Sequence, residues 1–325
     1  MQRFEGRVAV VTGAASGIGR ALARAFLNEN MRVVIADVQR PALEAVAEDL
    51  RAAGGEVLAV ATDVSVADDM SALAERAEEE FGRVHVVCHN AGVFAAGLSW
   101  EAPLSDYAWV FDVNVWGVIH GVRAFTPLQL AHGEEGHIVI TASMAGVTST
   151  PFCAPYTMSK HAVLALAETM HLELTAKGAA IGVSVLCPEV VNTRIGDSDR
   201  NRPPHRKRGG PSHDERELAE GALRQSTSLG IDPDAIAART LSAIRARRFY
   251  VLSPEGDPFR DACHARLDAI RHERNPGSAL AGLLAPLASA ALEVRPVGTR
   301  VNRVENDDAS LLEAVPEPPR QPSLF

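Results

Sequence analysis

The chain has 325 residues, enough for one large domain with additional segments. Hydrophobic residues make up 46% and charged residues 22%, as in ordinary globular proteins, and the net charge of −9 argues against general nucleic-acid affinity. No signal peptide precedes the strand predicted at Val8, and no apolar run approaches the ~20 residues of a membrane helix. We therefore expect a cytoplasmic protein with neither a membrane nor a nucleic acid as partner.

Short apolar runs alternate with amphipathic segments from Val8 to Ser253. The runs are continuous, which is typical of strands covered on both faces, and the segments between them have helical periodicity. This alternation predicts an α/β fold: a Rossmann-type, doubly wound, seven-stranded parallel sheet with helices on both faces. The predicted strands are Val8–Val11, Arg32–Ala36, Glu56–Ala61, Val84–Cys88, His137–Thr141, Gly182–Cys187 and Arg247–Ser253. The predicted helices are Arg20–Asn28, Pro41–Ala53, Val66–Phe81, one from about Ser105 to Ala131, the helix that bears Tyr156, and Pro258–Glu273.

A glycine-rich loop, Thr12–Gly19, joins the first strand to the first helix. Glycines permit a tight turn and let backbone N–H groups approach a phosphate, and the helix N-terminus adds partial positive charge. Asp37 ends the second strand, where a carboxylate can bind the hydroxyls of an adenosine ribose and would repel a 2′-phosphate. Arg40 is the only nearby cation, so the sequence favours NAD over NADP. A solvated loop aspartate is the alternative interpretation of Asp37.

Two further strand ends carry candidate cofactor contacts. Asp63 and Val64 follow the third strand, where they could contact the adenine, and the small-residue turn Asn90–Gly92 follows the fourth. Ligands of open parallel sheets bind at this carboxyl edge. Asn114 lies inside the long predicted helix, a poor position for Asn unless its side chain has a particular role. Capping of a kink near Gly117 is the structural alternative.

Tyr156 and Lys160 are four residues apart and therefore lie on one face of a predicted helix. Tyrosine ionises near pH ~10, and a lysine one turn away favours the phenolate and lowers its pKa toward that of a useful general base. The Tyr-x-x-x-Lys pattern alone also fits a surface helix. Ser143, at the end of the fifth strand, and the glycine-rich loop favour a catalytic role.

In combination these motifs resemble those of the short-chain dehydrogenase/reductase family. The resemblance is close from Arg7 to about Thr193 and loose to about Ser253. It rests on Thr12–Gly19, Asn90–Gly92, Asn114, Ser143, Tyr156 with Lys160, and Pro188–Thr193.

The resemblance implies a role for each catalytic residue. Tyr156 would be the general acid/base and Ser143 would hydrogen-bond the substrate oxygen. Lys160 would bind the nicotinamide ribose and lower the pKa of the tyrosine, and Asn114 would hold a water in a proton relay. A hydride would pass between a secondary alcohol or ketone and the nicotinamide. The implied cofactor-binding residues are Gly13, Ser16, Gly17, Ile18, Gly19, Asp37, Asp63, Val64, Asn90, Ala91, Gly92, Tyr156, Lys160, Pro188, Val191 and Thr193.

The chain departs from the family pattern in two places. Glu189 stands after Pro188 where the family usually has glycine, so its side chain either shapes the substrate pocket or points to solvent. The T-G-x-x-x-x-V-D-G-G segment near the last strand of many relatives is absent, and the ending instead resembles bacterial dehydrogenases of aryl-glycerols and similar bulky alcohols. Phe94–Trp100 and Thr148–Pro155 would line the pocket, which favours a bulky apolar or aromatic substrate.

Three regions are predicted along the chain. Residues 1–255 form the catalytic domain, with a substrate lid at about 194–230. The basic, Pro/Gly-rich segment Arg200–Gly210 fits a solvated loop in this lid better than a nucleic-acid or nuclear-localisation patch, and attraction of an anionic substrate is a third interpretation. Residues 256–292 form a helical extension, in which Ala279–Leu292 carries an apolar stripe suited to covering the pocket or a neighbouring subunit. Residues 293–325 are predicted to be a disordered tail.

The eleven histidines show no metal-ligand spacing, so no metal is expected. The four cysteines, Cys88, Cys153, Cys187 and Cys263, are expected to be reduced. Relatives in the family pair through the long helix and the Tyr156 helix, which implies a homotetramer or homodimer. The predicted activity is that of an NAD-dependent alcohol dehydrogenase or ketone reductase. Two alternatives stay open: a catalytically silent NAD-binding sensor or scaffold, and an epimerase or dehydratase.

Overall fold

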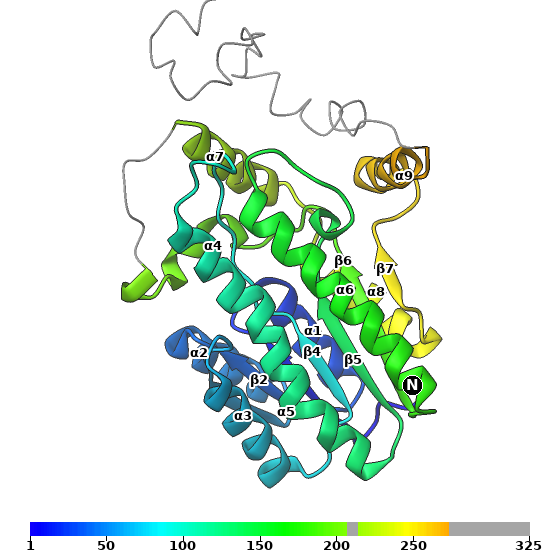
Figure 1. Cartoon of the computed structure of the whole chain (residues 1–325). Helices are drawn as coiled ribbons and strands as arrows, with labels where there is room; N and C mark the ends of the chain where they lie inside the picture. The colour runs from blue at the N-terminus through cyan, green and yellow to red at the C-terminus, as the bar shows by residue number, and fades with distance from the viewer. Residues whose placement is uncertain (207–213, 273–325) are drawn as a thin grey trace, which may run out of the picture. The chain divides into compact units, whose positions relative to one another are not determined.

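The computed structural model describes residues 1–206 and 214–272. Within them, seven strands form one parallel sheet in the order β3-β2-β1-β4-β5-β6-β7 (Figure 1), which confirms the predicted Rossmann-type fold. The strand order reverses between β1 and β4, the point at which doubly wound sheets bind their ligands. The strands are β1 Val8–Thr12, β2 Arg32–Asp37, β3 Val57–Ala61, β4 Val86–His89, β5 Gly136–Thr141, β6 Ile181–Cys187 and β7 Tyr250–Leu252.

Helices connect the strands and cover both faces of the sheet (Figure 1). The α-helices are α1 Gly17–Asn28, α2 Arg40–Ala52, α3 Ala67–Phe81, α4 Leu104–Phe111, α5 Gly117–His132, α6 Ala154–Ala176, α7 Asp214–Ser228, α8 Pro233–Ala246 and α9 Pro258–Arg271. Four short helical turns are η1 Asp112–Trp116, η2 Met144–Gly146, η3 Ile195–Asn201 and η4 Pro204–Arg206.

Burial on both faces explains why the strands are continuous apolar runs. Ala9 and Val11 of β1 pack in one cluster with side chains of α1, α2 and α8, including Phe26. Val8 and Val10 point to the other face, where they pack with α3 and α5. Further along that face, β5 and β6 pack against α6. Phe26 is 0% exposed, and burial of such a side chain stabilises the fold by about 1.5–3 kcal/mol.

The helix predicted from about Ser105 to Ala131 is confirmed, since the chain is helical from Leu104 to His132, but one turn of π-helix, η1, lies between α4 and α5. Asn114 lies in this turn and is 1% exposed. Its side chain accepts a hydrogen bond from the Val93 N–H (2.8 Å) and donates to the Val93 carbonyl (3.0 Å) and to Ser159 Oγ (3.0 Å). Asn114 therefore does not cap a kink at Gly117. It holds the π-turn against the segment that follows β4.

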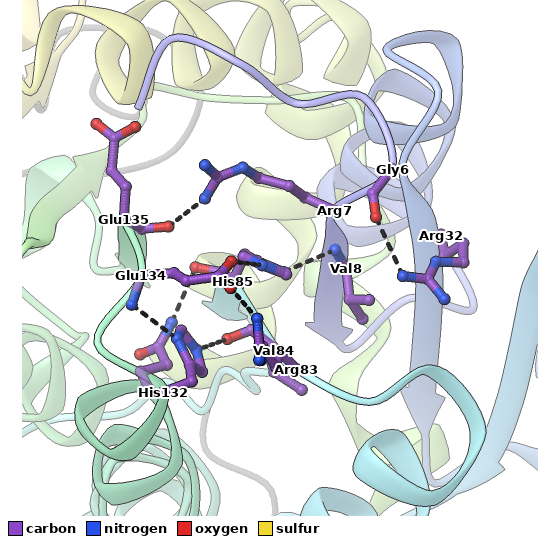
Figure 2. A network of polar contacts seen from close by, with 11 residues as sticks. Gly6, Arg7, Val8, Arg32, Arg83, Val84, His85, His132, Glu134 and Glu135 are labelled. Carbon is purple, nitrogen blue, oxygen red and sulfur yellow. Dashed lines mark hydrogen bonds and ion pairs between the residues drawn. The ribbon is translucent and has the colours of Figure 1, made fainter.

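At the edge where the strands begin, Figure 2 shows a network of polar contacts. His85 Nδ1 accepts from the Val8 N–H (3.1 Å), so its Nε2–H donates to Glu134 (3.0 Å). His132 Nδ1 accepts from the Glu134 N–H (3.0 Å), so its Nε2–H donates to the Val84 carbonyl (2.9 Å). Each pattern needs a neutral imidazole with a single N–H. Burial accordingly holds the pKa of His85 below its ordinary value.

Part of the predicted extension packs on the catalytic core. Cys263 and Phe259 of α9 join the apolar cluster of β5, β6 and α6. Residues 207–213 of the lid, the apolar stripe at Ala279–Leu292 and the tail at 293–325 lie outside the described residues. In the part of the chain that is described, every helix is too short or too polar to cross a membrane, and no cluster of three His, Cys, Asp or Glu could hold a metal ion.

Candidate active site

The loop between β1 and α1 forms a cradle of bare backbone. Gly13 and Gly17 have φ of +67° and +53°, where side chains are disfavoured. A Cβ at Gly13 would lie 2.8 Å from Ala91 Cα, and one at Gly19 would lie 2.2 Å from the Gly13 oxygen. Ser16, the N-cap residue of α1, makes no side-chain capping bond. The cradle and the helix N-terminus above it fit the diphosphate of a dinucleotide.

Asp37 is oriented toward this loop at the end of β2. Its Oδ2 accepts from the Ala15 N–H (3.1 Å) and its Oδ1 accepts from the Gln39 N–H (2.9 Å). The Gln39 side chain donates in turn to Asn201 of η3, so the lid reaches the end of the site where the sequence predicts the adenosine.

The other predicted positions after β3 and on α1 lie at the same edge. The Asp63 carboxylate accepts from the Ser65 hydroxyl (2.6 Å). Val64 is 8% exposed and packs against Gly117, where a Cβ would lie 2.7 Å from its Cγ2. Ile18 packs against the core cluster beneath α1. The Val64 and Ile18 side chains thus pack against the protein core at this edge, while the Asp63 carboxylate caps the turn that follows β3.

Asn90 ties three strand ends together. Thr12 Oγ1 accepts from the N–H groups of Asn90 (3.0 Å) and Ala91 (3.1 Å). Asn90 Nδ2 donates to the Thr12 carbonyl (3.0 Å), and its Oδ1 accepts from Thr141 Oγ1 (3.2 Å). The turn that ends at Gly92 is thereby fixed to β1 and β5. Sequence reasoning assigned no role to Thr141, although a threonine that closes a strand at the ligand edge is a usable signal.

The structure brings the predicted catalytic residues together at the carboxyl edge of β5. Ser143 lies two residues after the end of β5, near enough to the Tyr156 side chain of α6 for its hydroxyl to lower the pKa of the phenol. Lys160 Nζ lies 5.6 Å from the centroid of the Tyr156 ring and donates to the Thr141 carbonyl (2.9 Å). The Phe94 ring packs on the Tyr156 ring with centroids 5.1 Å apart. A phenol, a hydroxyl and an ammonium thus converge beside the glycine cradle.

Burial dominates the electrostatics of this group. It raises the pKa of Tyr156 to about 12, against the opposing effect of the hydrogen bond with Ser143. It lowers the pKa of Lys160 to about 8. Burial therefore holds the pKa of Tyr156 above its ordinary value, whereas the helical spacing of Tyr156 and Lys160 predicts a lowered one.

Ser159 connects Asn114 to the catalytic helix. Its hydroxyl donates to the Tyr156 carbonyl (2.7 Å) and accepts from Asn114 Nδ2 (3.0 Å), and it is 0% exposed. Sequence reasoning missed this residue. The available signal was a small polar side chain on the buried face of the helix, next to Lys160.

The loop after β6 is fixed by an ion pair that neither interpretation of Glu189 anticipated. Glu189 binds Arg239 of α8 through two hydrogen bonds of 2.7 and 3.1 Å, and its side chain is 6% exposed. It therefore neither lines an open pocket nor points to solvent. Pro188 precedes it directly after β6, and Val191 pairs with Ile231 in an isolated bridge. The same loop then brings the methyl group of Thr193 over the cradle, 2.9 Å from where a Cβ of Gly17 would lie.

Arg202 anchors the lid to α4. Its guanidinium pairs with Asp106 (2.9 Å) and Asp199 (2.8 Å) and lies 4.0 Å over the Trp109 ring. The Arg202 side chain is 6% exposed and that of Asp106 is 0% exposed. A buried, doubly paired guanidinium stacked on an aromatic ring is a strong local attachment.

A cavity of about 340 Å³ lies between η3, α7 and Phe94. Ser198 Oγ, at its inner wall, accepts a hydrogen bond from the Phe94 N–H (2.9 Å). Phe94 therefore contacts the cavity on one side and Tyr156 on the other. The lining residues are Phe94, Arg194, Gly196, Asp197, Ser198, Asp199, Arg200, Glu220 and Arg224.

Comparison with known proteins agrees with this geometry. The family model described as short chain dehydrogenase matches residues 7–203. A 1-deoxy-11-beta-hydroxypentalenate dehydrogenase of Streptomyces avermitilis is 43% identical over 267 residues, which cover 78% of this chain and 88% of the relative. A short chain dehydrogenase/reductase of Burkholderia phymatum, solved in complex with NAD, superposes with a TM-score of 0.83 at 43% identity, covering 86% of this chain and 99% of that one. The apo form of LigO from a Sphingobium strain superposes with a TM-score of 0.67 at 30% identity, covering 90% and 100%. The chain is thus an oxidoreductase that belongs to the short-chain dehydrogenase/reductase family.

Proposed function

We propose that the protein is an NAD-dependent dehydrogenase of a bulky secondary alcohol, which in the reverse direction reduces the ketone. The observation that carries the proposal is the convergence of Ser143, Tyr156 and Lys160 beside the glycine cradle. The name of the Streptomyces avermitilis relative, a hydroxypentalenate dehydrogenase, supports a hydroxylated substrate. The NAD complex of the Burkholderia phymatum relative supports the choice of dinucleotide.

The cofactor preference rests on Asp37. Its carboxylate is held beside the glycine loop by two backbone N–H groups, and it would repel the 2′-phosphate of NADP. Gly13, Gly17 and Gly19 would hold the diphosphate, and Lys160 would bind the nicotinamide ribose. The bound nicotinamide supplies the hydride acceptor or donor.

The chain's own residues handle the proton. In alcohol oxidation Tyr156 Oη removes the hydroxyl proton, while the Ser143 hydroxyl donates a hydrogen bond to the same substrate oxygen. In ketone reduction Tyr156 gives its proton to the ketone oxygen, and the nearby Lys160 ammonium stabilises the phenolate that this leaves. Both amide protons of Asn114 are committed to Val93 and Ser159, so a relay water would donate to one of its oxygens.

The pKa of Tyr156 predicts that ketone reduction and alcohol oxidation are favoured at different pH. Burial keeps Tyr156 protonated at neutral pH because its pKa is raised to about 12. The neutral phenol is the form that protonates a ketone, so reduction should proceed near neutrality. Oxidation needs the phenolate and should accelerate as the pH rises.

The test measures turnover of a panel of secondary alcohols with NAD and, separately, with NADP. The absorbance of the NADH or NADPH formed gives the rate. We expect NADH formation, and a strong preference for NAD in kcat/KM. Tyr156→Phe should lower the rate by about 10²–10⁴-fold while the Kd for NAD stays unchanged. NAD binding without turnover of any alcohol would favour a silent sensor. Conversion of substrate without net NADH would favour an epimerase or dehydratase.

A further inference from the structure

The loop Pro188–Thr193, between β6 and the lid, carries a buried carboxylate that the proposed mechanism does not use. Glu189 stands where the family usually has glycine, and it binds the Arg239 guanidinium of α8 through two hydrogen bonds of 2.7 and 3.1 Å. The Glu189 side chain is 6% exposed and that of Arg239 is 29% exposed. Removing one partner of such a pair is costly, because the other keeps a charge that has lost part of its water. The pair therefore restrains the loop strongly.

The two ends of this loop contact two different parts of the site. At its start the Pro188 carbonyl accepts a hydrogen bond from the Met144 N–H (3.1 Å), and Met144 directly follows Ser143. At its end the methyl group of Thr193 lies over the cradle, 2.9 Å from where a Cβ of Gly17 would lie. A dinucleotide with its diphosphate in the cradle and its nicotinamide at the catalytic group would therefore run along this loop.

The side of the loop away from the site is held by α8 and the residue that precedes its N-cap. Ile231 donates a hydrogen bond to the Val190 carbonyl (3.1 Å) and accepts one from the Asn192 N–H (2.8 Å). Side chains of α8 pack in the same core cluster as those of β1 and α1. The Glu189–Arg239 pair thus connects the loop to a helix that is fixed in the core.

We propose that Glu189 and Arg239 are a positioning pair for the cofactor. They hold the loop where Thr193 covers the diphosphate and where the Pro188 end stays beside Ser143. The two side chains bind each other, so they act on the cofactor through the backbone of the loop. With glycine at position 189 the bidentate contact with α8 would be lost, and the backbone bonds to Ile231 would remain. This role concerns cofactor binding and does not depend on which alcohol is oxidised.

The test compares a ligand that reaches the loop with one that does not. The Kd of the full chain is measured for NAD by calorimetry and for adenosine by ligand-observed NMR. Adenosine lacks the diphosphate and the nicotinamide, and would bind only at the Asp37 end. In Glu189→Ala the Kd for NAD should rise at least about tenfold, while the Kd for adenosine changes less than about twofold.

A second variant and a matched control complete the test. Glu189→Gln keeps the size of the side chain but replaces one acceptor oxygen by an amide that cannot accept from a guanidinium, so its Kd for NAD should rise at least about threefold. Asp234→Asn is the control. Asp234 also lies on α8 and pairs with an arginine, Arg24 of α1, but both side chains are about half exposed. Its Kd for either ligand should match that of the wild type.

Each other outcome has a distinct meaning. An unchanged Kd for NAD in Glu189→Ala overturns the positioning role. An equal loss for NAD and adenosine shows that the pair stabilises the domain as a whole, and overturns it as well. If Glu189→Ala does not fold, Glu189→Gln decides by the same two criteria. Failure of the proposed function is a separate result: the variants would lose NAD affinity as expected, and the wild type would still oxidise none of the alcohols.

Discussion

Removing the charge of Arg202 should open the lid. Arg202→Met keeps most of the length of the side chain but removes the guanidinium that pairs at 2.9 Å with Asp106, whose side chain is 0% exposed. Breaking a buried ion pair in this way costs about 3–5 kcal/mol, and loss of the stacking on Trp109 adds to this. If the lid opens as a local unit, a loss of about 3 kcal/mol shifts the equilibrium between the closed and the open lid by about 100-fold, since each 1.4 kcal/mol is a factor of ten. We therefore expect the KM for the alcohol to rise by up to about 100-fold.

The assay is a double-mutant cycle with Arg202→Met, Asp106→Asn and the combination, measuring KM, kcat and the thermal unfolding temperature. The double variant should lose less than the sum of the single losses, because both single substitutions remove the same ion pair. Arg206→Met is the matched control: Arg206 pairs with Asp112 at 2.7 Å, but both side chains are about one-third exposed, so the effect should stay below about fivefold. An unchanged KM in Arg202→Met with a lower unfolding temperature would show that the pair stabilises the fold without holding the lid.

Three further predictions concern the catalytic helix, acid stability and assembly. Lys160→Ala should weaken NAD binding in a fluorescence titration and move the alkaline rise of the oxidation rate to higher pH, because the phenolate of Tyr156 loses its nearby cation; an unchanged pH profile would contradict this role. Burial holds the pKa of His89 at about 4 in the folded state against 6.5 when unfolded, so its contribution to stability is complete above pH ~6.5 and is lost as the pH falls toward 4. The ~2.5-unit shift corresponds to about 3 kcal/mol in urea unfolding, and a free energy of unfolding that stays flat between pH 7 and 4.5 would refute it. The protein should form a homo-oligomer through η1 and α6, where Trp116 and Met158 are each 51% exposed, and a monomer in light scattering at micromolar concentration would exclude this.

The sheet and the carboxyl-edge residues were predictable because their signals are local. A run such as Val8–Val11 is apolar at every position, and both faces of β1 are buried. Asp37 and Asn90 are recognisable because each closes such a run, and parallel strands bring their ends to one edge. The catalytic helix follows from the four-residue spacing of Tyr156 and Lys160, which the structure places on one face.

Features that depend on distant partners could not be predicted in the same way. Glu189 binds Arg239, 50 residues further along the chain, and no pattern in either segment indicates the pair. The π-turn at Asn114 arises from bonds to Val93 and Ser159, which only the packed structure brings together. The pKa of Tyr156 was misjudged for a related reason: spacing gives the distance to a cation along a helix, but burial depends on everything that surrounds it.

The two edges of the sheet can be altered independently of each other. Reaction, cofactor and lid residues all lie where the strands end, whereas the contacts among His85, His132 and Glu134 lie where the strands begin (Figure 2). A glutamine in place of His85 would keep one acceptor for the Val8 N–H and one donor for Glu134 but could not take up a proton. The pH response of the His85 contacts can therefore be changed where the strands begin, while substrate choice is changed where they end.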